Sequence, residues 1–172
     1  MTVSSGKTPH RGFLPAVIVL CGGKSSRMGY PKWRLPFGGE RMLDRVLRIT
    51  REISGTQIVV AANDQQVDDV PPHVKFAFDE RPERGPLQGI HAGLDALPES
   101  IDAAFVTSCD VPMLVPGFVR RLFELLTPET QIVVPVEEKF QHPLAAVYRP
   151  SVLSVVTQLL EQDHLRPVFL FD

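Results

Sequence analysis

From Ala16 to Lys32 the chain reads AVIVLCGGKSSRMGYPK. The first part, Ala16–Cys21, is continuously apolar rather than alternating, which is typical of a strand covered on both faces in a parallel sheet. The pair Gly22-Gly23 comes next, and adjacent glycines let backbone N–H groups approach an anion with no side chain in the way. Hydroxyl groups and fixed positive charges follow in the same segment. We therefore predict a buried strand that opens into a loop for phosphate groups.

Two commoner phosphate-binding motifs do not fit this segment. A Walker A loop would need a glycine five positions before Gly23, where the chain has Ile18. The G-x-G-x-x-G spacing of dinucleotide-binding loops is also missing. A simple glycine turn with surface charges is the plainer interpretation, but the triplet Arg27-Met28-Gly29 and Lys32 in the same short segment argue against it.

Beyond this segment, apolar runs and helical spacing alternate along the chain. The further runs are Gln57–Ala62, Val74–Phe78, Ala103–Ser108 and Gln131–Val136. Helical spacing of apolar residues covers 43–53, 87–97, 115–126 and 152–160. Such alternation predicts an α/β layered fold with a mostly parallel sheet. No repeat or linker divides the chain, so we expect a flexible N-terminal extension over residues 1–14 and one domain over residues 15–172.

The composition excludes several classes of protein. The chain has 172 residues, a formal net charge of -2 and 44% apolar residues, which is ordinary for a globular protein. No basic excess indicates nucleic acid, and the apolar runs are far too short to span a bilayer. Cys21 and Cys109 form no CxxC pair, so we expect buried, reduced thiols. With a polar N-terminus that lacks a signal-peptide stretch, the sequence predicts a cytoplasmic protein without membrane or nucleic-acid partners.

Polar residues directly follow the predicted strands. Asn63 follows the second apolar run, Asp79 the third and Cys109-Asp110 the fourth. In open α/β sheets, ligands bind beyond the carboxyl ends of the strands, where the strand order reverses. Taken singly, Asn63 is an ordinary turn residue and Asp110 an ordinary helix cap. Their shared placement at strand ends nevertheless predicts an enzyme.

Three motifs, in this order, resemble the nucleotidyltransferases related to molybdenum cofactor guanylyltransferase. The glycine-rich segment is similar to the signature L-A-G-G-x-x-x-R-M-G-x-x-K, with Cys21 in place of the alanine. The stretch 85–89 matches G-P-L-x-G, and the stretch 109–112 matches C-D-x-P. The resemblance covers nearly the whole chain from Pro15 onward. It implies a three-layer Rossmann-like nucleotidyltransferase fold with a mostly parallel central sheet.

The resemblance also implies roles for individual residues. Those that would bind the nucleotide are Leu20, Cys21, Gly22, Gly23, Lys32, Asn63, Asp79, Gly85, Pro86 and Leu87. Those that would take part in catalysis are Arg27, Lys32 and Asp110. Asp110 would also bind Mg²⁺, which prefers one or two carboxylates together with phosphate oxygens and water. His142 would lie near the acceptor side.

The activity that the resemblance implies is Mg²⁺-dependent transfer of GMP from GTP to the phosphate of the molybdenum-pterin cofactor, with release of pyrophosphate. Molybdoenzymes or cofactor-pathway proteins are further partners that it suggests. An acceptor phosphate is already ionised near neutral pH, so no strong base is needed, and the chain shows no Ser/His/Asp or Cys/His set. We therefore expect positioning and charge neutralisation, without a covalent enzyme intermediate.

Three alternatives stay open at this point. A cytidylyltransferase for the same pterin tends to have L-A-A-G where this chain has Cys21-Gly22-Gly23, so the second glycine favours guanine. A sugar-phosphate nucleotidyltransferase shares the fold but is usually longer. The third alternative is a nucleotide-binding accessory protein without catalytic activity.

The last residues, Phe169-Leu170-Phe171-Asp172, depart from the family pattern. Relatives continue into a further strand and an N-x-N-T-P-type turn, and no Asn-Thr-Pro occurs in this chain. We therefore expect a domain that lacks the family's C-terminal segment. Its metal would be held by Asp110 and phosphate oxygens alone, with weaker Mg²⁺–GTP binding and slow transfer.

Overall fold

The computed structural model describes residues 12–22, 30–63, 67–81 and 84–171. Within these residues, a central sheet of six strands has the order β5-β4-β1-β6-β10-β7. The strands are β1 (Pro15–Leu20), β4 (Gln57–Ala62), β5 (Lys75–Asp79), β6 (Ala103–Ser108), β7 (Ile132–Val133) and β10 (Ala145–Tyr148). Strands β5, β4, β1 and β6 are parallel, which confirms the predicted mostly parallel sheet.

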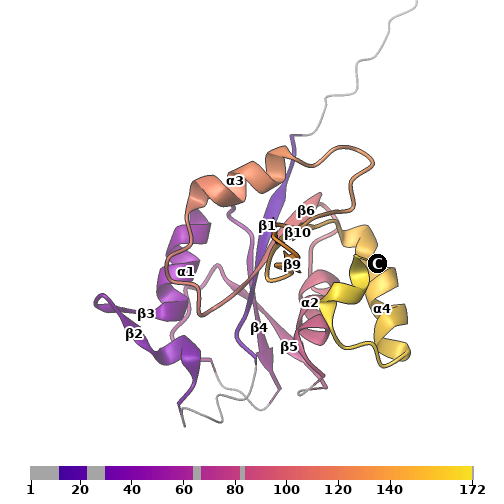
Figure 1. Cartoon of the computed structure of the whole chain (residues 1–172). Helices are drawn as coiled ribbons and strands as arrows, with labels where there is room; N and C mark the ends of the chain where they lie inside the picture. The colour runs from indigo at the N-terminus through magenta and orange to yellow at the C-terminus, as the bar shows by residue number, and fades with distance from the viewer. Residues whose placement is uncertain (1–11, 23–29, 64–66, 82–83, 172) are drawn as a thin grey trace, which may run out of the picture.

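Helices cover both faces of this sheet and complete three layers (Figure 1). They are α1 (Met42–Arg51), α2 (Pro86–Asp95), α3 (Pro116–Glu124) and α4 (Leu153–Glu161). Apolar residues of α1 and α3 pack with Val17, Val19 and Val59 on one face, while α2 and α4 pack with Ile18, Ile58 and others on the opposite face. Because both faces of β1 and β4 are covered, these strands need apolar side chains throughout, as their sequences show. The α/β three-layer fold expected from the sequence is thereby confirmed.

The predicted strand over Gln131–Val136 is wrong as a single element. Ile132–Val133 forms β7, and β8 (Val136–Glu137) pairs instead with β9 (Phe140–Gln141) in a separate hairpin. Pro135 separates the two, and because proline has no N–H it cannot continue a strand ladder. Its carbonyl oxygen accepts a hydrogen bond from His142 N at 3.0 Å, next to the Val136–Gln141 pair of that hairpin.

Strand β10 was not predicted, and it is the element that breaks the parallel pattern. Ala145–Tyr148 pairs antiparallel with β6 on one side and with β7 on the other. A run of four residues after His142-Pro143 gives too little periodicity to separate a strand from a turn.

The remaining short elements connect the layers. They are η1 (Lys32–Arg34), β2 (Pro36–Phe37), β3 (Glu40–Arg41), η2 (Pro150–Val152) and η3 (Pro167–Leu170). Strands β2 and β3 pair with each other in a hairpin that leads into α1. In the part of the chain that the structure describes, no helix is long and apolar enough to cross a membrane.

Candidate active site

The ends of β1, β4 and β6 meet at the reversal of strand order. Leu20 pairs with Val60 of β4 on one side and with Ser108 of β6 on the other. One residue further on, Cys21 N donates to Val60 O at 2.8 Å and Cys109 N donates to Leu20 O at 3.0 Å. Gly22 therefore leaves the sheet at the point where ligands of open α/β sheets bind.

Of the four residues from Leu20 to Gly23, the structure describes Leu20, Cys21 and Gly22. Leu20 and Cys21 are 7% and 5% exposed, so their side chains point into the protein core. A Cβ atom at Gly22 would lie 4.0 Å from Ala62 N, which is an ordinary contact distance. Packing within the protein therefore does not require a glycine at position 22. A ligand that approaches the backbone closely there would require it. Gly23 and Arg27 lie outside the described residues.

Cys21 and Cys109 lie next to each other beneath the strand ends. Both thiols are free and buried in the same apolar cluster as Val19. A hydrogen bond between the two thiols and then burial raise the pKa of Cys21 well above its ordinary value. The expectation of buried, reduced thiols agrees with this environment.

Lys32 and Asp110 form an ion pair at this edge of the sheet. Lys32 Nζ donates to Asp110 Oδ2 at 2.7 Å, and the two side chains are 51% and 30% exposed. Burial pushes the pKa of Asp110 upward, but the hydrogen bonds from Lys32 and Ser108 and the lysine charge outweigh it and lower that pKa overall. The same bond raises the pKa of Lys32. Both groups are therefore ionised at neutral pH, and the structure joins two predicted site residues that are 78 positions apart.

Ser108 is a contact of the site that the sequence analysis missed. Its hydroxyl donates to Asp110 Oδ1, and Asp110 N donates back to Ser108 Oγ at 3.4 Å. The carboxylate is thus held from both oxygens. A serine hydroxyl that accepts from the backbone N–H two residues on is a common turn, so the sequence contained a signal for the backbone contact but none for the bond to the carboxylate.

Arg45 of α1 is a second missed contact. Its Nε donates to Pro112 O at 2.7 Å, two residues beyond Asp110, and its Nη1 lies 2.9 Å from Glu40 Oε1. The guanidinium also stacks over the Phe37 ring at 5.1 Å. Arg45 therefore ties the loop that carries Asp110 to α1, which packs on the same face of the sheet, a contact that no local sequence pattern indicates.

Asn63 and Asp79 meet at the ends of β4 and β5. Asn63 N donates to Asp79 O at 3.3 Å, and Asp79 Oδ1 accepts from Arg81 N at 2.9 Å. Partial burial raises the pKa of Asp79, and the Arg81 hydrogen bond opposes that rise. The two predicted nucleotide-binding residues thus lie together, on the β4 side of Gly22.

The predicted motif at the start of α2 needs its glycine. Gly85 has a φ of 75°, and a Cβ atom there would lie 3.1 Å from Leu165 O. Pro86 occupies the first turn, where its missing N–H is not needed. Leu87 is fully buried in the core, so its side chain contributes to packing and only its backbone can face a ligand.

His142 lies at the same edge of the sheet as Asp110. Because β10 is antiparallel to β6, Ala145 pairs with Thr107 near the end of β6, and His142 precedes it by three residues. His142 O accepts from Ala145 N at 3.0 Å, and its ring Nε2 lies 3.5 Å from Glu137 Oε2. This position is compatible with the acceptor side that the sequence analysis expected.

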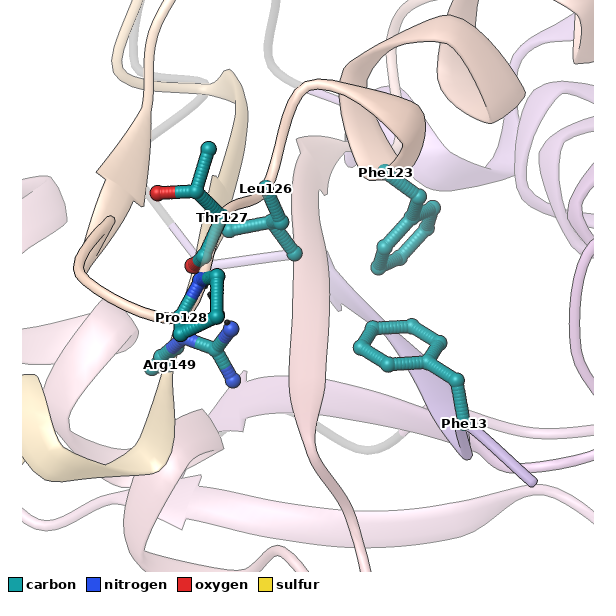
Figure 2. Close-up of a pocket in the computed structure, with 6 residues that line it drawn as sticks. All are labelled: Phe13, Phe123, Leu126, Thr127, Pro128 and Arg149. Atoms are coloured by element: carbon teal, nitrogen blue, oxygen red, sulfur yellow. Dashed lines mark hydrogen bonds between the residues drawn. The ribbon is translucent and has the colours of Figure 1, made fainter. Parts of the chain in front are cut away.

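A hollow of about 510 Å³ lies at the opposite edge of the sheet (Figure 2). It is lined by Phe13, Phe123, Leu126, Thr127, Pro128 and Arg149. Phe13 and Phe123 meet edge to face at 5.9 Å, and the Arg149 guanidinium donates to the carbonyls of Thr130, Asp102 and Thr127. Arg149 therefore anchors backbone, and none of the predicted site residues lines this hollow.

The described residues contain no group of three His, Cys, Asp or Glu side chains that could hold a metal ion. A divalent cation at Asp110 would take its other ligands from water or from the oxygens of a bound phosphate. The donor set suits Mg²⁺, which commonly binds proteins through one or two carboxylates and substrate phosphates.

Solved structures of other proteins share this fold. Molybdopterin-guanine dinucleotide biosynthesis protein A from Archaeoglobus fulgidus superposes with a TM-score of 0.74 at 22% identity, over 91% of this chain and 78% of that one. The 4-diphosphocytidyl-2C-methyl-D-erythritol synthase of Anaerococcus prevotii gives a TM-score of 0.60 at 12% identity, over 87% and 76%. At these identities the likeness shows the fold.

Residues 17–170 match the family model of the MobA-like NTP transferase domain, so the protein is a nucleotidyltransferase and belongs to that family. A relative is the probable molybdenum cofactor guanylyltransferase of Methanosarcina mazei, 33% identical over 178 aligned positions that cover 96% of this chain and 78% of that protein. The molybdenum cofactor guanylyltransferase of Vibrio cholerae is 28% identical over 157 positions, 90% of this chain and 75% of that protein.

Proposed function

We propose that this protein transfers GMP from GTP to the phosphate of the molybdenum-pterin cofactor and releases pyrophosphate. The observation that carries the proposal is the Lys32–Asp110 pair beside Gly22, in a chain whose relatives are named molybdenum cofactor guanylyltransferases. A lysine cation, a carboxylate and the glycine backbone at Gly22, together at one edge of the sheet, are what a nucleoside triphosphate needs.

The reaction is an in-line displacement at the α-phosphorus of GTP. An oxygen of the acceptor phosphate forms the new P–O bond, and the bond to the oxygen that bridges to the β-phosphorus breaks with its electron pair leaving on pyrophosphate. The acceptor oxygen is already ionised, so no residue has to remove a proton. Catalysis then rests on position and on neutralised charge.

The chain's own residues divide these tasks. We assign the phosphates to backbone groups of the segment Leu20–Gly23 that begin beyond Cys21, because Cys21 N already donates to Val60 O. Arg27 is proposed to bind the phosphates as well, and Lys32 to meet the charge that grows near the α-phosphorus. Asp110, oriented by Ser108, is the protein ligand of Mg²⁺. When bound, Mg²⁺ supplies neutralisation of phosphate charge.

The residues at the ends of β4 and β5 are proposed to recognise the base and ribose. The half-buried Asp79 carboxylate accepts hydrogen bonds, and guanine offers N–H donors on its Watson–Crick edge. Cytosine has one amino donor and two acceptors on the same edge, and a carboxylate repels the two acceptors. Asn63 and the start of α2 at Gly85–Leu87 complete this wall, and His142 lies on the acceptor side.

The test is an assay of pyrophosphate release with Mg²⁺, the molybdenum pterin and each of the four NTPs in turn. We expect release with GTP only, and a loss of about 100-fold or more in Asp110→Asn because the divalent ion loses its carboxylate. A preference for CTP would identify a cytidylyltransferase. Release that is equal for all bases would reject the recognition assigned to Asp79.

A further inference from the structure

Lys32 already occupies the carboxylate that the proposed function assigns to the metal ion. Its Nζ lies 2.7 Å from Asp110 Oδ2, while the Ser108 hydroxyl donates to Oδ1. Both oxygens of the carboxylate thus accept a hydrogen bond in the described structure. A divalent cation that approaches Asp110 meets an ammonium group at the same oxygen.

Lys32 combines an anchored backbone with an exposed side chain. It begins η1, in which the next residue, Trp33, is 1% exposed. The guanidinium groups of Arg34 and Arg41 lie 4.7 Å and 5.6 Å from the centre of the Trp33 ring. The side chain of Lys32 is nevertheless 51% exposed. Its backbone is therefore fixed beside the site while its four-carbon stem remains able to swing.

We propose that the Lys32 ammonium holds the place of the divalent ion at Asp110 in the nucleotide-free protein, so that the ion binds well only with a triphosphate that draws the lysine away. The inference rests on the proposed function, because it assumes that Asp110 is the metal ligand. A triphosphate offers oxygens to the lysine and to the metal at once. Each ligand then strengthens the binding of the other, as thermodynamic linkage requires.

The coupling favours binding of the metal ion together with the triphosphate over binding of the metal ion alone. A metal ion alone gains one carboxylate and must displace an ammonium, whereas the metal–triphosphate complex brings its own phosphate ligands and a new partner for Lys32. In the exchange, the Lys32–Asp110 pair is replaced by a Lys32–phosphate pair and a metal–Asp110 pair. The carboxylate therefore always keeps a cation. Such compensation matters because Asp110 is only 30% exposed and an unpaired, partly buried carboxylate is unfavourable.

The experiment measures Mn²⁺ binding by the loss of the free-ion signal in electron paramagnetic resonance, with no nucleotide present. We expect Lys32→Met to bind Mn²⁺ about three- to tenfold more tightly than the unmodified protein, since the competing charge of a partly exposed pair is gone. Lys32→Arg, which keeps the charge, should bind as weakly as the unmodified protein. Circular dichroism of each variant checks that the fold is retained.

Two further variants make the result specific. Arg120→Met removes a cation of similar exposure, 53%, whose partner is Glu52 rather than Asp110, so it should leave Mn²⁺ affinity unchanged. Lys32→Met combined with Asp110→Asn should lose the gain. Equal Mn²⁺ affinity in Lys32→Met and the unmodified protein, or an equal gain in Arg120→Met, would overturn the inference.

The proposed function has a separate point of failure. If Asp110→Asn released pyrophosphate as fast as the unmodified protein in the assay above, Asp110 would not be the metal ligand. A Lys32→Met protein that gains no affinity while Asp110→Asn loses turnover would reject the coupling and leave the proposed function standing.

Discussion

At the scale of single residues, the charge on Lys32 is the feature with the clearest kinetic consequence. If the ammonium meets charge that develops in the transition state, Lys32→Ala should lower kcat by about 100-fold and raise KM for GTP far less. Steady-state rates of pyrophosphate release separate the two parameters. A rise in KM alone would make Lys32 only a binding residue. Arg120→Ala, on the surface of α3, provides the control and should leave both parameters near those of the unmodified protein.

At the scale of elements, the contact of α2 with β1 sets a strict limit on side-chain size. A Cβ atom at Gly93 would overlap Ile18 Cγ2 and would lie 3.2 Å from Val60 Cγ2, so Gly93→Ala should destabilise the fold by about 1–3 kcal/mol. Gly117 in α3 is the matched control, since nothing lies within 4 Å of its Cβ position. Gly117→Ala should leave the free energy of unfolding unchanged or raise it by up to about 1 kcal/mol. Urea unfolding measures both, and equal effects would contradict the packing described for α2.

The elements also show how far the sequence could predict the fold. Runs such as Gln57–Ala62 were predicted with their observed bounds because burial on both faces demands continuous apolar residues. Strand β10 was missed because its pairing with β6 depends on the tertiary fold rather than on its own four residues. The bond from Arg45 to Pro112 O was beyond prediction for the same reason, whereas the place of Asp110 just beyond β6 could be predicted because the end of an apolar run fixes it.

At the scale of the whole molecule, stability should fall at alkaline pH. Burial raises the pKa of Tyr148 above its ordinary value of 10.0, and the contact with Cys109 and burial raise that of Cys21 above 9.0. The folded protein keeps these protons at a pH where the unfolded chain releases them. The free energy of unfolding therefore decreases as pH rises, first above about 9 and more steeply above about 10, by at most about 1.4 kcal/mol per pH unit for each group.

Urea unfolding at pH 7, 9 and 10.5 tests this dependence. Tyr148→Phe should flatten the decline above pH 10, although it loses the 2.8 Å hydrogen bond to Pro143 O and is less stable at pH 7. A variant whose decline above pH 10 equals that of the unmodified protein would remove Tyr148 from the explanation.

The place of β10 between β6 and β7 has a consequence for synthesis on the ribosome. β7 leaves the exit tunnel before β10, yet β10 is the strand through which β7 joins the sheet. Until residues 145–148 have emerged, the nascent chain exposes the backbone edge of β6 from Ala104 to Thr107, which β10 later pairs. An open edge on an apolar strand is a template for pairing with other chains. At this stage of translation the nascent protein therefore carries an open apolar edge that the folded protein lacks, and a chaperone that covers residues 104–107 would protect it from such pairing.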